Sequence, residues 1–157
     1  MLKDIDFLDL AHKYAEENST CAKVVVGSAI VTHGGYGRPM FFGCNHGCSN
    51  CKKNGCRRIK LYGDASKEHR LPSDCDALHS EIDAIAAAAK KGMKVEGATI
   101  YVTRYPCEAC ARAIAAAGIK RVVYGRKEDI SDYTRQILEA GNVIVEKVEW
   151  EREDNNE

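Results

Sequence analysis

From residue 79 to residue 148 the sequence alternates between helix-like and strand-like segments, and this alternation constrains the fold more than any other feature. Three segments have apolar residues at helical spacing, and each ends before a glycine: 79–91, 107–117 and 131–140. Three strand-like segments follow them in turn: 98–103, 121–125 and 142–148. Strands that are joined by helices usually pair in parallel, and the helices cover the faces of the sheet. The pattern predicts a three-layer α/β domain with several parallel strands.

The N-terminal part of the chain adds one helix and two more strands to this pattern. Residues 5–18 have the spacing of an amphipathic helix. A β-branched run, 22–31, and a short run, 39–43, flank the turn-forming sequence THGGYGR, as the two arms of a hairpin do.

Residues 44–75 are an insertion of different character. They contain five of the eight cysteines, two of the five histidines and many charged residues, and their apolar residues show no clear period. Because so few apolar residues cannot form a core, we predict that this Cys-rich segment is irregular and is held in place by metal. The whole of 1–150 then forms one domain, and the acidic tail 151–157 is expected to fray.

The charge and hydropathy of the chain limit the kinds of partner that it can bind. The formal net charge at pH 7 is zero, whereas a chain whose main partner is nucleic acid usually has a basic excess. One basic cluster would fit either a phosphate contact or a solvated surface: Lys52, Lys53, Arg57, Arg58 and Lys60. No segment approaches the roughly 20 apolar residues of a membrane span, and the charged N-terminus is unlike a secretory signal peptide. We therefore expect a cytoplasmic protein without a membrane or nucleic-acid partner.

Two cysteines at the start of a predicted helix give the strongest chemical signal. Cys107 and Cys110 are three residues apart, so their sulfurs lie on one side of the helix and can bind one cation. The helix N-terminus also favours the thiolate that metal binding requires. A C-x-x-C pair alone would equally fit a redox pair or half of a structural zinc site. A further ligand is needed to decide among these kinds of site.

His79 is that further candidate, because it too stands at the start of a helix in the same layer. One imidazole and two thiolates give three protein ligands, and the open fourth position is typical of a catalytic zinc. Glu81, just after His79, could stand beside a water at that position and transfer protons. The helix itself is expected to pack through its apolar stripe: Leu78, Ile82, Ile85, Ala86 and Ala89.

These motifs resemble those of the cytidine and deoxycytidylate deaminase superfamily, most closely its zinc-dependent deoxycytidylate (dCMP) deaminases of phage and bacterial type. LHSEIDAIAAAAKKG is similar to the helix that carries their His-Ala-Glu motif, and ATIYVTRYPCEACARAIAAAGIKRVVYG to their second zinc helix and the strand after it. STCAKVVVGSAIV and FFGCNHG resemble their first strand and their Gly-Tyr-Asn-Gly loop. The resemblance implies a three-layer αβα sandwich with a central mixed five-stranded sheet.

The resemblance also implies a reaction, which is the hydrolysis of dCMP to dUMP and ammonia in nucleotide metabolism. A catalytic zinc ion held by His79, Cys107 and Cys110 would activate water, and Glu81 would move the protons. Members of the family form dimers or hexamers, so we expect a homo-oligomer.

Five residues are candidate substrate contacts. Asn45 aligns with the family's asparagine that contacts sugar or phosphate, and Ser80 replaces an alanine whose backbone N–H holds the pyrimidine carbonyl. Tyr105, beside the second zinc helix, could lie against the base. If the insertion folds over the site, Arg57 or Arg58 would bind the 5′-phosphate and favour dCMP over deoxycytidine.

The remaining cysteines predict at least one additional zinc, because dense cysteines in a cytosolic chain are usually ligands. Some phage dCMP deaminases hold a structural zinc with a cysteine near the first strand and a histidine before the catalytic one, and Cys21 and His69 occupy those places. The other candidate ligands, for this zinc or for one wholly within the insertion, are Cys44, Cys48, Cys51, Cys56 and Cys75. The ligand set stays open. Regulation by deoxynucleoside triphosphates also stays open, since Cys44 and His46 alter the loop region that regulated members use.

Two alternatives to a dCMP deaminase remain. The first is a deaminase of the same superfamily that acts on cytosine, guanine, a riboflavin precursor or adenosine in tRNA, although the zero net charge disfavours tRNA. The second is a non-catalytic, zinc-stabilised nucleic-acid-binding module whose basic insertion acts like a zinc knuckle. Glu81 argues against the second, since a binding module needs no carboxylate at an open zinc position.

Overall fold

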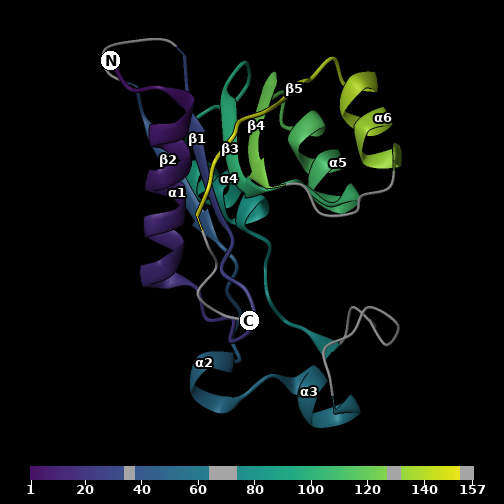
Figure 1. The fold of residues 1–157 in the computed structure, drawn as a ribbon. Coiled ribbons are helices and arrows are strands. Elements are labelled where there is room, and N and C mark those ends of the chain that lie inside the picture. The colour runs from purple at the N-terminus through teal and green to yellow at the C-terminus, as the bar shows by residue number, and fades with distance from the viewer. Residues whose placement is uncertain (34–37, 64–73, 127–131, 153–157) are drawn as a thin grey trace.

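The computed structural model describes residues 1–33, 38–63, 74–126 and 132–152, and a mixed five-stranded sheet lies at its centre (Figure 1). The strands are β1 (Gly27–Val31), β2 (Met40–Cys44), β3 (Thr99–Arg104), β4 (Arg121–Arg126) and β5 (Ile144–Lys147). Their order is β2-β1-β3-β4-β5. β1 is antiparallel to β2 and β3, and β3, β4 and β5 are parallel. The predicted mixed sheet is confirmed.

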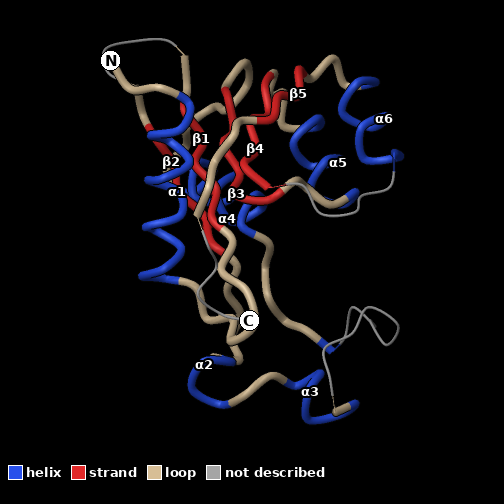
Figure 2. Tube along the Cα trace, viewed as in Figure 1, coloured by secondary structure: helices blue, strands red, loops and turns tan. Residues whose placement is uncertain are grey.

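Helices cover both faces of this sheet. The long helices are α1 (Asp4–Asn18), α4 (Ser80–Lys90), α5 (Glu108–Ala116) and α6 (Asp132–Ala140). α1 lies on one face, and α4 and α5 lie on the other, with α6 beside α5 (Figures 1 and 2). The αβα sandwich is therefore confirmed. Among the helices in the described ranges, none is long and apolar enough to cross a membrane.

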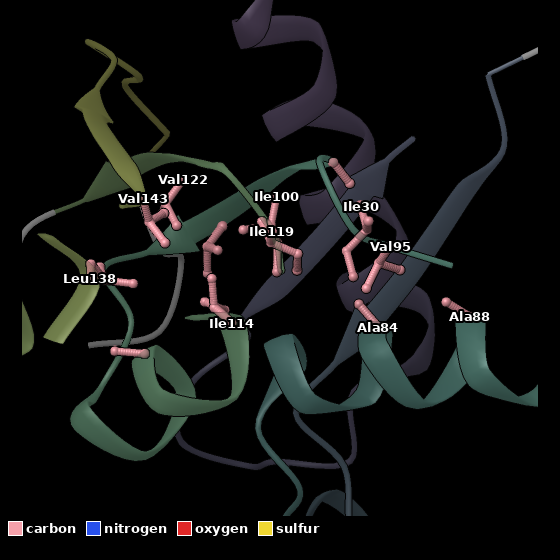
Figure 3. Packing of buried hydrophobic residues seen from close by; sticks show 13 residues of the cluster. Ile30, Ala84, Ala88, Val95, Ile100, Ile114, Ile119, Val122, Leu138 and Val143 are labelled. Atoms are coloured by element: carbon pink, nitrogen blue, oxygen red, sulfur yellow. The ribbon is translucent and has the colours of Figure 1, made fainter. Parts of the chain in front are cut away.

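Two hydrophobic cores hold the three layers together. Along β3, Ile100 and Val102 point into the core shared with α4 and α5 (Figure 3), while Tyr101 between them points to α1. Leu8 of α1 and Ile114 of α5 are both fully buried, one in each core. Burial of a leucine or isoleucine side chain contributes about 1.5–3 kcal/mol, so these cores fix the helices that carry the site.

The packing face of α4 differs from the predicted apolar stripe. The helix contacts the sheet through Ala84 and Ala88, which are buried, whereas Leu78 is 37% exposed and Ala86 and Ala89 are exposed. Ile85 packs only partly against the core and Ile82 is half-buried. The prediction was wrong because alanines surround the helix, so apolar spacing alone does not select its inner face.

Both ends of the described chain are attached to the sheet or to α1. Arg121 of β4 donates two hydrogen bonds to Asp4 of α1, at 3.0 and 2.7 Å. Trp150 is 5% exposed and donates its indole N–H to Asp9 of α1 at 3.0 Å. Its ring lies so close to Gly125 that a Cβ there would be 2.6 Å from it. The chain thus remains packed as far as Trp150.

The Cys-rich insertion contains more regular structure than predicted. Two short helices, α2 (Cys51–Asn54) and α3 (Arg57–Tyr62), lie beyond one end of the sheet (Figure 1). Asn50 caps α2 by accepting a hydrogen bond from the Lys53 N–H at 3.1 Å. Neither helix has a buried residue, which agrees with the absence of an apolar period in this part of the sequence.

Candidate metal centre and active site

The structure brings His79, Cys107 and Cys110 together at the starts of two neighbouring helices. His79 precedes α4, Cys107 precedes α5, and Cys110 lies in the first turn of α5. His79 Nδ1 is 3.4 Å from Cys107 Sγ and 3.5 Å from Cys110 Sγ. Ligands of a tetrahedral zinc, with Zn–S of about 2.3 Å and Zn–N of about 2.0 Å, would stand about 3.5 Å apart. The three residues therefore fit a zinc ion.

The electrostatics of the two cysteines also suit a cation. A hydrogen bond from Cys110 lowers the pKa of Cys107 to about 3, and the same interaction raises the pKa of Cys110. The pair therefore shares one proton, and a bound divalent cation would replace it and hold both sulfurs as thiolates. Cys110 is buried, whereas His79 and Cys107 are exposed. The centre is closed on the side of the protein core and open on the other side.

Glu81 is the buried acidic group of the site, with only 4% of its surface exposed. Its carboxylate accepts a hydrogen bond from the hydroxyl of Ser80 at 3.2 Å, and it interacts electrostatically with the Cys110 thiol. Burial raises the pKa of Glu81, and interaction with His79 opposes that rise. A carboxylate whose pKa is raised toward neutrality can both accept and return a proton beside an open metal position.

Ser28 is a residue of the site that the sequence analysis missed. It lies on β1, and its Oγ is 2.6 Å from the Oγ of Ser80. Both side chains are fully buried. One hydroxyl inside the apolar run VVVGSAIV was the available signal, because a buried hydroxyl requires a partner. That partner lies 52 residues away in the sequence, which local patterns do not reveal.

Asp83 is a second missed residue, and it attaches the loop after β2 to α4. One carboxylate oxygen accepts the Cys44 N–H at 3.0 Å, and the other is 2.9 Å from His46 Nε2. His46 also forms a β-bridge with Leu78, the residue before the candidate ligand His79. The altered loop is therefore tied to the metal centre through both backbone and side chain.

Asn45, a predicted substrate contact, holds the backbone of a neighbouring segment. Its Oδ1 accepts hydrogen bonds from the Val26 N–H at 2.9 Å and from Ser19 Oγ at 2.8 Å. Its Nδ2 donates to the Val24 carbonyl at 2.8 Å. The side chain thus takes the place of a neighbouring strand before Gly27, and β1 is shorter than the predicted strand 22–31.

The other predicted substrate contacts lie in two places. Tyr105 follows β3, meets Tyr124 edge-on with ring centroids 4.7 Å apart, and donates its N–H to the Arg126 carbonyl at 2.9 Å. Arg57 and Arg58 lie on α3 of the insertion, where Arg57 is exposed and Arg58 is half-buried. Neither arginine joins the hydrogen bonds described above around Glu81.

Four of the remaining cysteines gather near the start of α2. Cys51 interacts electrostatically with Cys56, Cys21 and Cys75. Two hydrogen bonds hold these segments together, from the Lys52 N–H to the Thr20 carbonyl at 3.0 Å and from the Ser49 N–H to the Asp76 carboxylate at 2.7 Å. Within the described residues, only the His79 group has three ligand atoms within 4.8 Å of one another, so these sulfurs are more widely spread.

The last three candidate ligands are Cys44, Cys48 and His69. Cys44 lies at the end of β2, where burial raises the pKa of its thiol to about 11. Cys48 is exposed. His69 lies outside the described residues.

Fold and site together define a three-layer α/β domain with an open metal centre of one histidine and two cysteines. A family model described as "Cytidine and deoxycytidylate deaminase zinc-binding region" matches residues 1–126. The chain belongs to this family. The family's zinc supports the assignment of the centre as a zinc site.

Individual relatives agree with this assignment. The chain is 35% identical over 136 residues to the ComE operon protein 2 of Bacillus subtilis, covering 83% of this chain and 64% of that protein. It is 34% identical over 119 residues to the deoxycytidylate deaminase of Mycobacterium phage D29, covering 72% of this chain and 87% of that enzyme.

A solved structure of a dCMP deaminase is also similar. The enzyme of cyanophage S-TIM5 in complex with dCMP and dUMP superposes with a TM-score of 0.67 at 25% identity, covering 94% of this chain and 99% of that chain. The resemblance to dCMP deaminases that the zinc-binding motifs indicate is confirmed.

Proposed function

We propose that the protein is a zinc-dependent hydrolase that converts dCMP to dUMP and ammonia. The observation that carries this proposal is the buried carboxylate of Glu81 at an open centre of one imidazole and two thiolates. A structural zinc site would have four protein ligands and no need of a buried acid. The phage relatives named above support dCMP as the substrate.

In the proposed mechanism, Glu81 carries protons between water and substrate. The chemistry that zinc supplies when bound is a water whose pKa is lowered to about 7. Glu81 accepts a proton from the attacking water and delivers it to N3 of the pyrimidine, which makes C4 electrophilic. The backbone N–H of Ser80, in the first turn of α4, is available to hold the pyrimidine carbonyl. Glu81 then accepts the second proton of the attacking water and transfers it to the departing ammonia.

Substrate selection in this proposal depends on groups outside the metal centre. Tyr105 would lie against the base, and Arg57 or Arg58 would bind the 5′-phosphate. Asn45, the predicted sugar or phosphate contact, would act mainly by holding the backbone before β1, because its side chain is buried and hydrogen-bonded there. A charge-assisted hydrogen bond contributes about 1.5–3 kcal/mol, which corresponds to on the order of tenfold or more in affinity. Nucleic acid is not the proposed substrate, because the net charge is zero.

A substrate panel tests this proposal. Ammonia release is measured with zinc-loaded protein and dCMP, dCTP, cytidine, deoxycytidine, cytosine or guanine. We expect kcat/KM for dCMP to exceed that for deoxycytidine by at least about tenfold, and the Arg57→Ala/Arg58→Ala variant to lose this preference. Equal values for nucleotide and nucleoside would indicate a base or nucleoside deaminase, and no turnover of any substrate would favour a binding module.

We also propose a second, structural zinc in the insertion. The group of Cys21, Cys51, Cys56 and Cys75 supports it, since they interact near the start of α2 and the insertion has no buried apolar residue in its helices. His69 or Cys48 could replace one of these four. Metal analysis of the purified protein would give two zinc ions per chain, and one would remain in the His79→Ala/Cys107→Ala variant. A single zinc in the parent protein would refute this site.

We propose further that the protein forms a homo-oligomer in the cytoplasm. The exposed apolar residues Ala86 and Ala89 of α4, with Leu78 just before the helix, would be covered by a second copy of the chain in a homo-oligomer, a dimer or hexamer. A cytoplasmic location suits an enzyme whose free cysteines must stay reduced to bind metal.

A further inference from the structure

Two buried serines connect the carboxylate of Glu81 to the centre of the sheet. Ser28 Oγ is 2.6 Å from Ser80 Oγ, and Ser80 Oγ is 3.2 Å from Glu81 Oε2. Ser28 and Ser80 are both 0% exposed and Glu81 is 4% exposed, so these groups are shielded from solvent. Ser28 lies on β1, between β2 and β3, where it pairs with Gly43 of one strand and Val102 of the other.

The number of protons available fixes which group donates in each of these two hydrogen bonds. A hydroxyl has one proton to donate, and an ionised carboxylate can only accept. Ser80 must therefore donate to Glu81 Oε2. Its proton is then used, so Ser80 accepts from Ser28 across the 2.6 Å contact. Both hydroxyl protons point along the chain toward the carboxylate when Glu81 is ionised.

A carboxylate at the end of a glutamate side chain needs such a partner to keep one orientation. The last torsion of glutamate is broad, so packing of the aliphatic part does not fix the plane of the two oxygens. A hydrogen bond to Oε2 from a hydroxyl that is itself held by the sheet restricts that rotation. Small misplacements of a proton carrier can reduce turnover by about 100-fold.

We infer that Ser28 and Ser80 are positioning residues that orient the Glu81 carboxylate for proton transfer. This inference rests on the proposed deaminase function. By its resemblance to the family's His-Ala-Glu motif, the chain has Ser80 in place of the alanine, so this hydrogen bond refines the reaction without being required for it. Its expected effect is accordingly moderate and falls on turnover.

The test separates a positioning role from a purely structural one through three variants. Ser80→Ala leaves the Ser28 hydroxyl buried beside a methyl group, and should lower the Tm by about 2–6 °C. Ser28→Ala/Ser80→Ala removes both hydroxyls, so its Tm should return to within about 2 °C of the parent. In both variants we expect kcat for dCMP to fall about tenfold, with KM within about twofold. Ser28→Ala alone should reduce kcat less.

Thr99→Val is the matched control, because it removes a buried hydroxyl at the start of β3, whereas Cys107 of the metal centre follows the end of that strand. Thr99 is 2% exposed at the start of β3 and its Oγ1 is 3.0 Å from His33 Nε2. It should lower the Tm as Ser80→Ala does, with kcat and zinc content unchanged.

These measurements can contradict the positioning role of the serines without contradicting the proposed deaminase function. An active parent with a double variant of parental kcat would overturn the positioning role alone. A parent protein with full zinc content and no turnover of dCMP would overturn the proposed function, and the positioning role with it. A kcat that falls in proportion to the Tm, in Thr99→Val as in the serine variants, would show that the serines act only on stability.

Discussion

Each residue of the metal centre stands at a helix start, where backbone N–H groups lack partners within the helix. His79 and Cys107 are the residues before the first turns of α4 and α5. These positions carry a partial positive charge that stabilises thiolates and other anions. Acidic side chains in the same first turns, Glu81 and Asp83 of α4, are favoured for the same reason. The same feature of helix structure thus favours the candidate zinc ligands, the proposed proton carrier Glu81 and Asp83, which anchors the loop after β2.

The Asn45 side chain is predicted to stabilise the fold. Asn45→Ala removes two hydrogen bonds to backbone, with the Val24 carbonyl and the Val26 N–H, at a position that is 7% exposed, while the Ser19 hydroxyl keeps the Asn45 carbonyl as its acceptor. Because buried partners would be left unpaired, we expect the free energy of unfolding to fall by about 2–4 kcal/mol. Urea denaturation of parent and variant, without nucleotide, measures this loss. Unchanged stability with a raised KM for dCMP would instead make Asn45 mainly a substrate contact.

At the scale of elements, the position of Glu81 depends on how closely α4 approaches β2. A Cβ at Gly43 of β2 would lie 2.1 Å from the Ser80 carbonyl oxygen and 2.4 Å from the Ala84 nitrogen. Both contacts are with helix backbone, so the helix must move to admit a methyl group. Gly43 therefore sets the distance between the sheet and the helix that carries His79 and Glu81.

Gly43→Ala should accordingly reduce both stability and turnover. We expect a loss of about 1–3 kcal/mol in the free energy of unfolding and a fall of about tenfold or more in kcat. Gly92→Ala is the control, because Gly92 has φ of +67° and open space around its Cβ position. It should cost about 1 kcal/mol and leave kcat unchanged. A Gly43→Ala protein with parental kcat would show that α4 can shift without disturbing the site.

The grouping of His79, Cys107 and Cys110 could be predicted from local sequence because these candidate ligands lie within two short motifs at helix starts. The same spacing rules misplaced the inner face of α4, since its alanines are compatible with any face and the close approach at Gly43 selects Ala84 and Ala88. Ser28 was not predicted as a residue of the site because its partner, Ser80, belongs to an element that is distant in the sequence. Contacts that arise only when β1 meets α4 leave no periodic trace in the sequence.

At the scale of the whole molecule, the proposed assembly makes the outer face of α4 testable. Ala86→Glu/Ala89→Glu places two carboxylates on this exposed face, which should cost little in a monomer but dissociate an oligomer by charge and desolvation. Sedimentation velocity measures the mass of parent and variant. Lys13→Glu, exposed on α1 in the opposite layer, is the control and should leave the mass unchanged. A monomeric parent, or a variant that keeps the parental mass, would place the interface elsewhere.

In the proposed mechanism Glu81 moves protons at an open zinc centre, and the turnover of dCMP by a Glu81→Gln variant measures this role. Glutamine keeps the size of the side chain and its hydrogen bond to Ser80 but cannot accept and return a proton. We predict that zinc content and Tm match those of the parent, while kcat falls by a factor of about 100 to 10,000. A zinc-loaded Glu81→Gln protein that converts dCMP to dUMP within about tenfold of the parental rate would contradict the account.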